Sequence, residues 1–364
     1  MRLDLNDDQT FFFETVRRFV ESETPISTVR ERIDADDAFD RAWWRSAAEL
    51  GFTSFLVPES SGGGSVSGQG PVDLVIVAEE LGRGVVPHPL LPANVVAETL
   101  GRHASAAHAD VLTAIVAGEV VPAWVGADGG VTARRDGDRF VLDGTSVHVE
   151  AADQADQLLV TATSPDGVTQ FLVPADAAGI SIVRQESLDL LRHFGKVSFE
   201  GVAVDPDSVV GTVGGADADV DRQRSVALLL QCAESCGATA RVLEFTIEWG
   251  FDRFSFGRPL ASYQALKHRY ADMKLWLEAS HAITDEAAVA LSDPDASNDK
   301  VLAAKAYVGD KSVDIIQDCV QLHGGIGVTW EHDIHLYLRR ATVNRGLFGD
   351  PTAQRAALAG RLGI

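Results

Sequence analysis

Two glycine-bearing segments carry the residues best suited to holding a ligand. One runs from Arg253 to Leu260 with the sequence RFSFGRPL and is followed by Gln264. The other runs from Gln321 to Gly327 with the sequence QLHGGIG. Arginine makes forked, charge-assisted hydrogen bonds to phosphate, and glycine lets a backbone approach more closely than a Cβ atom would allow. Together the two segments predict a site for a phosphate-bearing cofactor.

Long helices position both segments. After about residue 218, apolar residues recur at helical spacing in one buried stripe, which contains Val226, Leu229, Leu230, Ala233, Gly237, Ala240, Leu243 and Ile247. Further helices are predicted from about Tyr263 past Trp276, and from about Asn298 to His323. We expect Gly324 and Gly325 to supply the left-handed conformation in which helices commonly end. Residues 218–364 therefore predict an antiparallel helical bundle.

Two regions with different patterns precede the bundle. Residues 1–117 show helical spacing, and Asn6-Asp7-Asp8 can cap the first helix. Residues 118–217 hold short apolar runs separated by turn residues, which favours a small antiparallel barrel or sandwich. The expected fold class is α+β, with an N-terminal helical domain, a middle β domain and a C-terminal bundle.

Composition narrows the class of protein. A chain of 364 residues with a net charge of −22 is long enough for two or three domains and would be repelled by nucleic acid. Cys232 and Cys236 lie four apart in a helical pattern, which favours buried thiols over a metal site or a disulfide. The start at Met1 has no basic-then-apolar signal, and no apolar run reaches about 18 residues. We expect a soluble cytoplasmic protein with no metal and no membrane partner.

The three-part order and the two motifs resemble the acyl-CoA dehydrogenase family over nearly the whole chain. The segments Leu5–Gln9 and Phe194–Val204 also resemble the family. The resemblance implies a middle antiparallel β-barrel, a C-terminal four-helix bundle and FAD as the cofactor. It further implies that an acyl-CoA is oxidised to 2-enoyl-CoA and that electrons pass to an electron-transfer flavoprotein.

In this family the two motifs meet FAD across a subunit interface. The residues that the resemblance assigns to the FAD site are Arg253, Phe256, Gly257, Gln264, Gln321, Gly324 and Gly325. It places Arg253 at the pyrophosphate, the rest of the first motif near the adenosine end, and the second motif where its backbone approaches the same moiety. The structural alternatives are a simple helix cap at Gly324, an ion pair for Arg253, and a satisfied helix-end histidine at His323.

The catalytic positions depart from the family pattern. A carboxylate should remove the α-proton while a β-hydride passes to the flavin. In many members this base precedes a glycine, a fixed distance after an Arg-x-Ala segment, which here is Arg339-Arg340-Ala341; the matching residue is Phe348, which cannot accept a proton. Other members place the base on the first bundle helix, close to Ala227 here. Where members hold the flavin ring with Trp-x-Thr, this chain has His148-Val149-Glu150.

Three explanations are compatible with these departures. The chain is a degenerate subunit of a heteromeric enzyme, as in some bacterial heterotetramers that act on steroid-derived or branched CoA thioesters. Alternatively, it is a self-sufficient dehydrogenase with a displaced base, for which Asp350, Glu331 and Glu150 are the candidate acids. The third explanation is a non-redox scaffold that binds a partner or a CoA ester.

Overall fold

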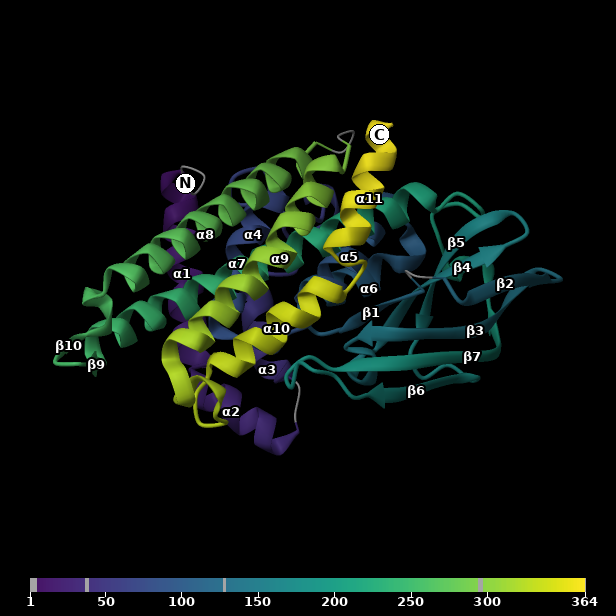
Figure 1. Ribbon diagram of the computed structural model, residues 1–364. Coiled ribbons are helices and arrows are strands. Elements are labelled where there is room, and N and C mark those ends of the chain that lie inside the picture. Colours follow the sequence, from purple (N-terminus) through teal and green to yellow (C-terminus); the bar gives the residue numbers. More distant parts are fainter. Residues whose placement is uncertain (1–4, 37–38, 127–128, 294–296, 364) are drawn as a thin grey trace.

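The N-terminal region of the computed structural model is helical, and the structure describes residues 5–36, 39–126, 129–293 and 297–363 (Figure 1). Its helices are α1 (Asp7–Glu23), α2 (Ile26–Ala35), α3 (Arg41–Glu49), α4 (Gly70–Gly84), α5 (Leu90–His103) and α6 (Ala109–Val116). Asn6 caps α1 as predicted, because its side chain accepts a hydrogen bond from the Gln9 backbone N–H at 2.8 Å. The stretch Met1–Asp4, on which the prediction of an absent signal rests, lies outside the described residues.

The middle region is one sheet of largely antiparallel strands. The strands are β1 (Pro122–Val125), β2 (Val131–Asp136), β3 (Arg139–Glu150), β4 (Gln157–Ser164), β5 (Gly167–Pro174), β6 (Ile180–Gln185), β7 (Phe194–Val204) and β8 (Val209–Val210). Their order is β6-β7-β3-β2-β4-β5-β8, with β1 also paired to β4. The pairs β1–β4 and β2–β4 are parallel, which the run of hairpin signals did not indicate.

The C-terminal region is a bundle of long helices. It contains α7 (Asp217–Asp252), α8 (Gln264–Leu291), α9 (Asp299–His323), α10 (Ile334–Gly346) and α11 (Pro351–Leu362). Between α7 and α8 lies a short hairpin of β9 (Phe254–Ser255) and β10 (Arg258–Pro259). Figure 1 shows this hairpin at the end of the bundle opposite the sheet. The α+β fold class with its helical, sheet and helical order is thus confirmed.

Helix α7 is the central element of the core. It packs against α4, α8, α9 and α10. By length and composition α7 could cross a membrane, but 94% of its most apolar window is buried inside the protein. Cys232 and Cys236 on this helix are free and buried, and burial raises the pKa of Cys232 to about 12. They are inert core thiols, as predicted.

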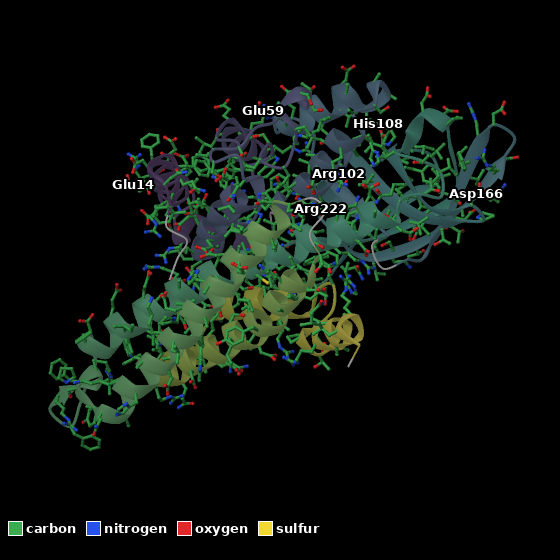
Figure 2. All side chains as sticks on the ribbon, turned by 90° about the horizontal axis from the view of Figure 1, so that it is seen from above. Glu14, Glu59, Arg102, His108, Asp166 and Arg222 are labelled. Atoms are coloured by element: carbon green, nitrogen blue, oxygen red, sulfur yellow. The ribbon has the colours of Figure 1, made fainter. Side chains whose placement is uncertain are left out.

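Polar contacts join the three regions near the start of α7. Arg222 donates to the Glu98 carboxylate on α5 and to the Leu291 carbonyl at the end of α8. Figure 2, which labels Arg222, shows it in the middle of the molecule. At the next residue of α7, the amide of Gln223 and that of Gln170 on β5 bond to each other at 2.8 and 2.9 Å. These contacts hold the sheet and the helices in one arrangement. The two glycine-bearing segments of the bundle therefore keep their positions relative to the sheet.

Candidate functional site

The first motif forms the hairpin at the end of α7. Its turn residues, Phe256 and Gly257, have φ angles of +49° and +79°, the pattern of a tight hairpin turn. The hydroxyl of Tyr263 donates to the Ser255 carbonyl at 2.7 Å, and the Arg258 guanidinium lies 3.8 Å from the Tyr263 ring centroid. The hairpin is therefore held in place from within. Phe256 at its tip is nonetheless 98% exposed.

The second motif follows the end of α9. Gly324 has φ +66° and ψ −140°, a region that essentially only glycine occupies. Gly325 does not have a positive φ, so the prediction that both glycines supply the left-handed helical conformation is wrong: Gly324 has a positive φ but a ψ outside that conformation. An added Cβ at Gly324 or Gly325 would meet no atom of this chain within 4 Å, whereas one at Gly327 would lie 2.6 Å from the Val320 carbonyl oxygen. Internal packing thus explains Gly327 but leaves the space beside Gly324 and Gly325 open.

The two motifs meet through stacked rings at the same end of the bundle. Trp249 on α7 stacks on His323, with ring centroids 5.5 Å apart and planes 20° from parallel. The Arg253 guanidinium lies 5.9 Å from the Trp249 ring centroid. His323 is buried and bonds the Cys319 carbonyl through Nδ1, and burial lowers its pKa. His323 is therefore a satisfied structural histidine, as interpreted from the sequence.

The helix-end surface, as we call this end of the bundle, has features expected of a covered face. Arg253 is exposed and makes no ion pair with any described residue, so the carboxylate alternative finds no support. Gln264 and Gln321 are also exposed. The exposed apolar side chains on the two motifs and beside them are Phe251, Phe254, Phe256, Ile326, Val328 and Trp330. Exposed apolar groups gathered on neighbouring segments mark an interaction site. Figure 2 shows this end of the bundle projecting beyond the sheet and the N-terminal helices.

The position expected to hold the flavin ring is closed. Phe348, which the family resemblance matches to the expected base, packs on Trp124 of β1 with ring centroids 5.3 Å apart. Gln354 secures the loop by donating to the carbonyls of Phe348 and Gly349. The space that Trp124, His148, Glu150 and Phe348 help to line is about 20 Å³, enough for roughly one water. The residues around this space therefore do not fit a flavin ring.

The candidate acids are separated in space. Glu331 is exposed beside the helix-end surface, and Asp350 caps α11 by accepting a hydrogen bond from the Ala353 N–H at 2.9 Å. Glu150 alone of the three lines the closed space, where burial raises its pKa and Arg192 pairs with it at 3.0 Å. Ala227 lies fully buried in the core. Glu150 is thus the one acid at the expected ring position, and it is already paired.

A buried ionic cluster that the sequence did not indicate adjoins Glu150. Arg192 also lies 3.3 Å from Glu234, and Arg340 contacts both Glu234 and Asp189. Arg340 was read from the sequence only as part of the Arg-x-Ala segment. No spacing rule brings residues from β3, the β6–β7 connection, α7 and α10 together, so this cluster is visible only in the folded chain.

Lys305 near this cluster gives a testable dependence on pH. It is buried on α9 and donates to the Gln231 side chain and to the Asn344 carbonyl. Burial lowers its pKa from 10.5 to about 8, so between these values the unfolded chain binds more protons than the folded chain. Raising the pH from about 7.5 to about 9.5 should therefore stabilise the wild type by on the order of 2 kcal/mol relative to Lys305→Met. Urea unfolding of both proteins at the two pH values measures this. An equal change in the free energy of unfolding with pH in the two proteins would contradict it.

The comparisons with known proteins identify the family. Residues 6–119 match the acyl-CoA dehydrogenase N-terminal domain, and residues 226–363 match the acyl-CoA dehydrogenase C-terminal domain. Acyl-CoA dehydrogenase IpdE2 of Mycobacterium tuberculosis is 31% identical over 346 residues, which cover 95% of this chain and 94% of the relative. The chain belongs to the acyl-CoA dehydrogenase family.

Two solved structures show how far the likeness extends. A variant of the Tcur3481-Tcur3483 steroid ACAD is 29% identical with a TM-score of 0.88, covering 98% of each chain. A glutaryl-CoA dehydrogenase from Mycobacterium smegmatis, solved with FADH2, has the same fold at 20% identity and a TM-score of 0.90, covering 98% of this chain and 95% of that one. The chain's membership of this family gives FAD as the cofactor and FAD-dependent acyl-CoA dehydrogenation as the reaction class.

Proposed function

We propose that this chain is one subunit of a heteromeric acyl-CoA dehydrogenase. Arg253 and the Gln321–Gly327 turn contribute to binding the pyrophosphate and adenosine of an FAD. The flavin ring and the catalytic carboxylate belong to a homologous partner chain. The complex oxidises an acyl-CoA to 2-enoyl-CoA, and the reduced flavin passes its electrons to an electron-transfer flavoprotein.

One contrast between the two parts of the site carries the proposal. At the helix-end surface, Arg253 is unpaired among the described residues and the space beside Gly324 and Gly325 is open, so this part fits a phosphate-bearing ligand. At the ring position, the contact between Phe348 and Trp124 leaves about 20 Å³. Such a chain can contact the pyrophosphate and adenosine of an FAD but has no room for its ring. It is therefore suited to completing the FAD site of a neighbouring subunit.

The likeness to the steroid enzyme supports both the assembly and the substrate class. That enzyme carries the names of two gene products, and it is described as a steroid ACAD. A steroid-derived CoA thioester is therefore the first substrate class to test in the assembled complex. The cytoplasm is the compartment we propose for it.

The alternative function that a specific residue favours is a self-sufficient dehydrogenase in which Glu150 is the base. Glu150 lines the closed space and burial raises its pKa, both of which are properties of catalytic acids. Against this, its carboxylate is paired with Arg192, and the space does not admit a ring and an acyl chain.

The flavin content of the protein separates these functions. The chain is purified alone and then after co-expression with a homologous chain, and the visible spectrum and FAD-to-chain ratio are measured. We expect a colourless protein alone and about one FAD per pair of chains together, counting sites by titration. A full yellow complement in the chain alone would make it self-sufficient, with Glu150 as the base to test. Colourless protein in both preparations would make it a scaffold.

A further inference from the structure

Five charged side chains of alternating sign are buried in one connected row where the middle domain meets the bundle. Its members are Glu150, Arg192, Glu234, Arg340 and Asp189, and the side chain of each is at most 8% exposed. Glu150 lies 3.0 Å from Arg192, Arg192 lies 3.3 Å from Glu234, and Glu234 lies 2.6 Å from Arg340. Arg340 then contacts Asp189. We call this set the junction network.

The junction network ties two domains together through polar contacts. Glu150 ends β3, and Asp189 and Arg192 lie in the connection between β6 and β7. Glu234 belongs to α7 and Arg340 to α10. Asn344, also on α10, accepts from Arg192 at 2.5 Å and donates to Glu234 at 2.8 Å. Removing Arg192 takes away the network partner of Glu150, and removing Arg340 takes away that of Asp189.

The energetics make such a network a device for fixing geometry. Desolvation of buried ions offsets most of their attraction, so the network adds little stability over an apolar packing of the same shape. Removing one partner is costly, because the opposite charge then stays buried and uncompensated. Asp189 is held by the N–H groups of Leu191 and Arg192, which fixes the connecting loop as well. The network therefore permits one relative position of the two domains.

Its location suggests what it replaces. Glu150 stands at the end of the segment where the family holds the flavin ring, and it lines the closed space beside Phe348. A ring placed there would itself contact the middle domain and the bundle. We propose that the junction network is a built-in clamp that substitutes for the flavin ring, so that this chain keeps its native domain arrangement without a flavin of its own. The inference rests on the proposed function, in which the ring belongs to the partner.

The clamp is tested by thermal unfolding and hydrogen exchange of the full-length chain. Arg192→Met should lower the unfolding midpoint by roughly 4–7 °C, because Glu150 and Glu234 lose their shared partner. Arg184→Met is the matched control, since Arg184 on neighbouring β6 pairs with exposed Asp36 on the surface. It should shift the midpoint by no more than about 1 °C. Amide exchange should accelerate in β3, β7 and α10 of Arg192→Met, but not in α1.

Further variants keep the test decisive. If Arg192→Met does not fold, Glu150→Gln retains the shape and removes one charge, and it should show the same local loss of protection. Removing both partners in Glu150→Leu/Arg192→Met should restore part of the lost midpoint, because no charge is then left unpaired. If Arg192→Met or Glu150→Gln showed the same midpoint shift and amide exchange as Arg184→Met, the clamp would be overturned.

Added FAD separates failure of the clamp from failure of the proposed function. The clamp predicts that saturating FAD leaves amide exchange in β3 of the wild-type chain alone unchanged, whereas FAD held only through Arg253 can still raise the midpoint. Slower exchange in β3 with FAD would show that a ring enters this chain, and both proposals would then fail. The clamp alone would be contradicted by two results together. The assembled pair would have its normal flavin content, and Arg192→Met would have the same unfolding midpoint and amide exchange as Arg184→Met.

Discussion

Arg253→Ala is expected to lower the affinity of the assembled complex for FAD by roughly 10- to 100-fold. Hydrogen bonds to charged groups contribute about 1.5–3 kcal/mol, and an arginine–phosphate pair makes two of them in parallel. Arg253 has no ion pair among the described residues, so the substitution removes only its contact with the Trp249 ring, 5.9 Å from the ring centroid. The affinity is measured by removing the flavin from the co-expressed complex and titrating FAD back.

A matched substitution distinguishes this effect from a general loss of charge. Lys274→Ala removes a half-exposed cation on α8 whose partner is Glu278, away from either motif. It should leave FAD affinity within about twofold, since exposed pairs contribute little. Unchanged flavin stoichiometry and affinity in Arg253→Ala would contradict a cofactor site at the helix-end surface.

Local signals in the sequence placed the long helices well. The expected start of α8 near Tyr263 and the expected span of α9 from Asn298 to His323 agree with Gln264 and Asp299–His323 in the structure. These helices are long, amphipathic and punctuated by proline and glycine, so neighbouring residues alone define their limits. Helix α2 was missed, because its ten residues carry one buried side chain, Val29, and show little apolar periodicity.

The closed inner site could be predicted only in part. The sequence could place Phe348 where the family resemblance expects a base, because a motif fixes that position along the chain. The partner of Phe348 was not visible, because Trp124 comes from β1 and meets it only after the middle domain has packed on the bundle. The same reason hid Arg192 from the sequence analysis. Long-range packing decides whether a substituted site is open, altered or sealed.

At the helix-end surface the sequence motif is present, and the structure shows which of its glycines the chain's own fold requires. Gly327 is required by the chain's own packing and Gly324 by its φ of +66°, whereas Gly325 faces open space and does not have a positive φ. A residue type that the fold itself does not need is best explained by something outside the chain. The sequence alone could not distinguish a glycine that the fold requires from one that leaves room for a ligand, because all three glycines look alike there.

Phe348→Glu is expected not to create a fast dehydrogenase from this chain alone. The new carboxylate would enter a space of about 20 Å³ that Glu150 already lines, and two carboxylates in one buried site oppose each other's ionisation. It would also lose the ring contact with Trp124, at a cost of about 3 kcal/mol or less since Phe348 is only partly buried.

The decisive quantity is turnover of the variant measured alone against turnover of the co-expressed wild-type complex, with an artificial electron acceptor. A correctly placed general base contributes about 10²–10⁴ in rate, so an idle carboxylate should leave the isolated variant at least about 10²-fold slower than the complex. Phe348→Gln serves as the control, because it has a similar shape to the glutamate and cannot act as a base. Turnover of isolated Phe348→Glu approaching that of the complex, with Phe348→Gln inactive, would show that the chain holds a flavin ring after all. The closed space around Glu150 would then have to open when flavin binds, and the partner would no longer be needed to explain the missing base.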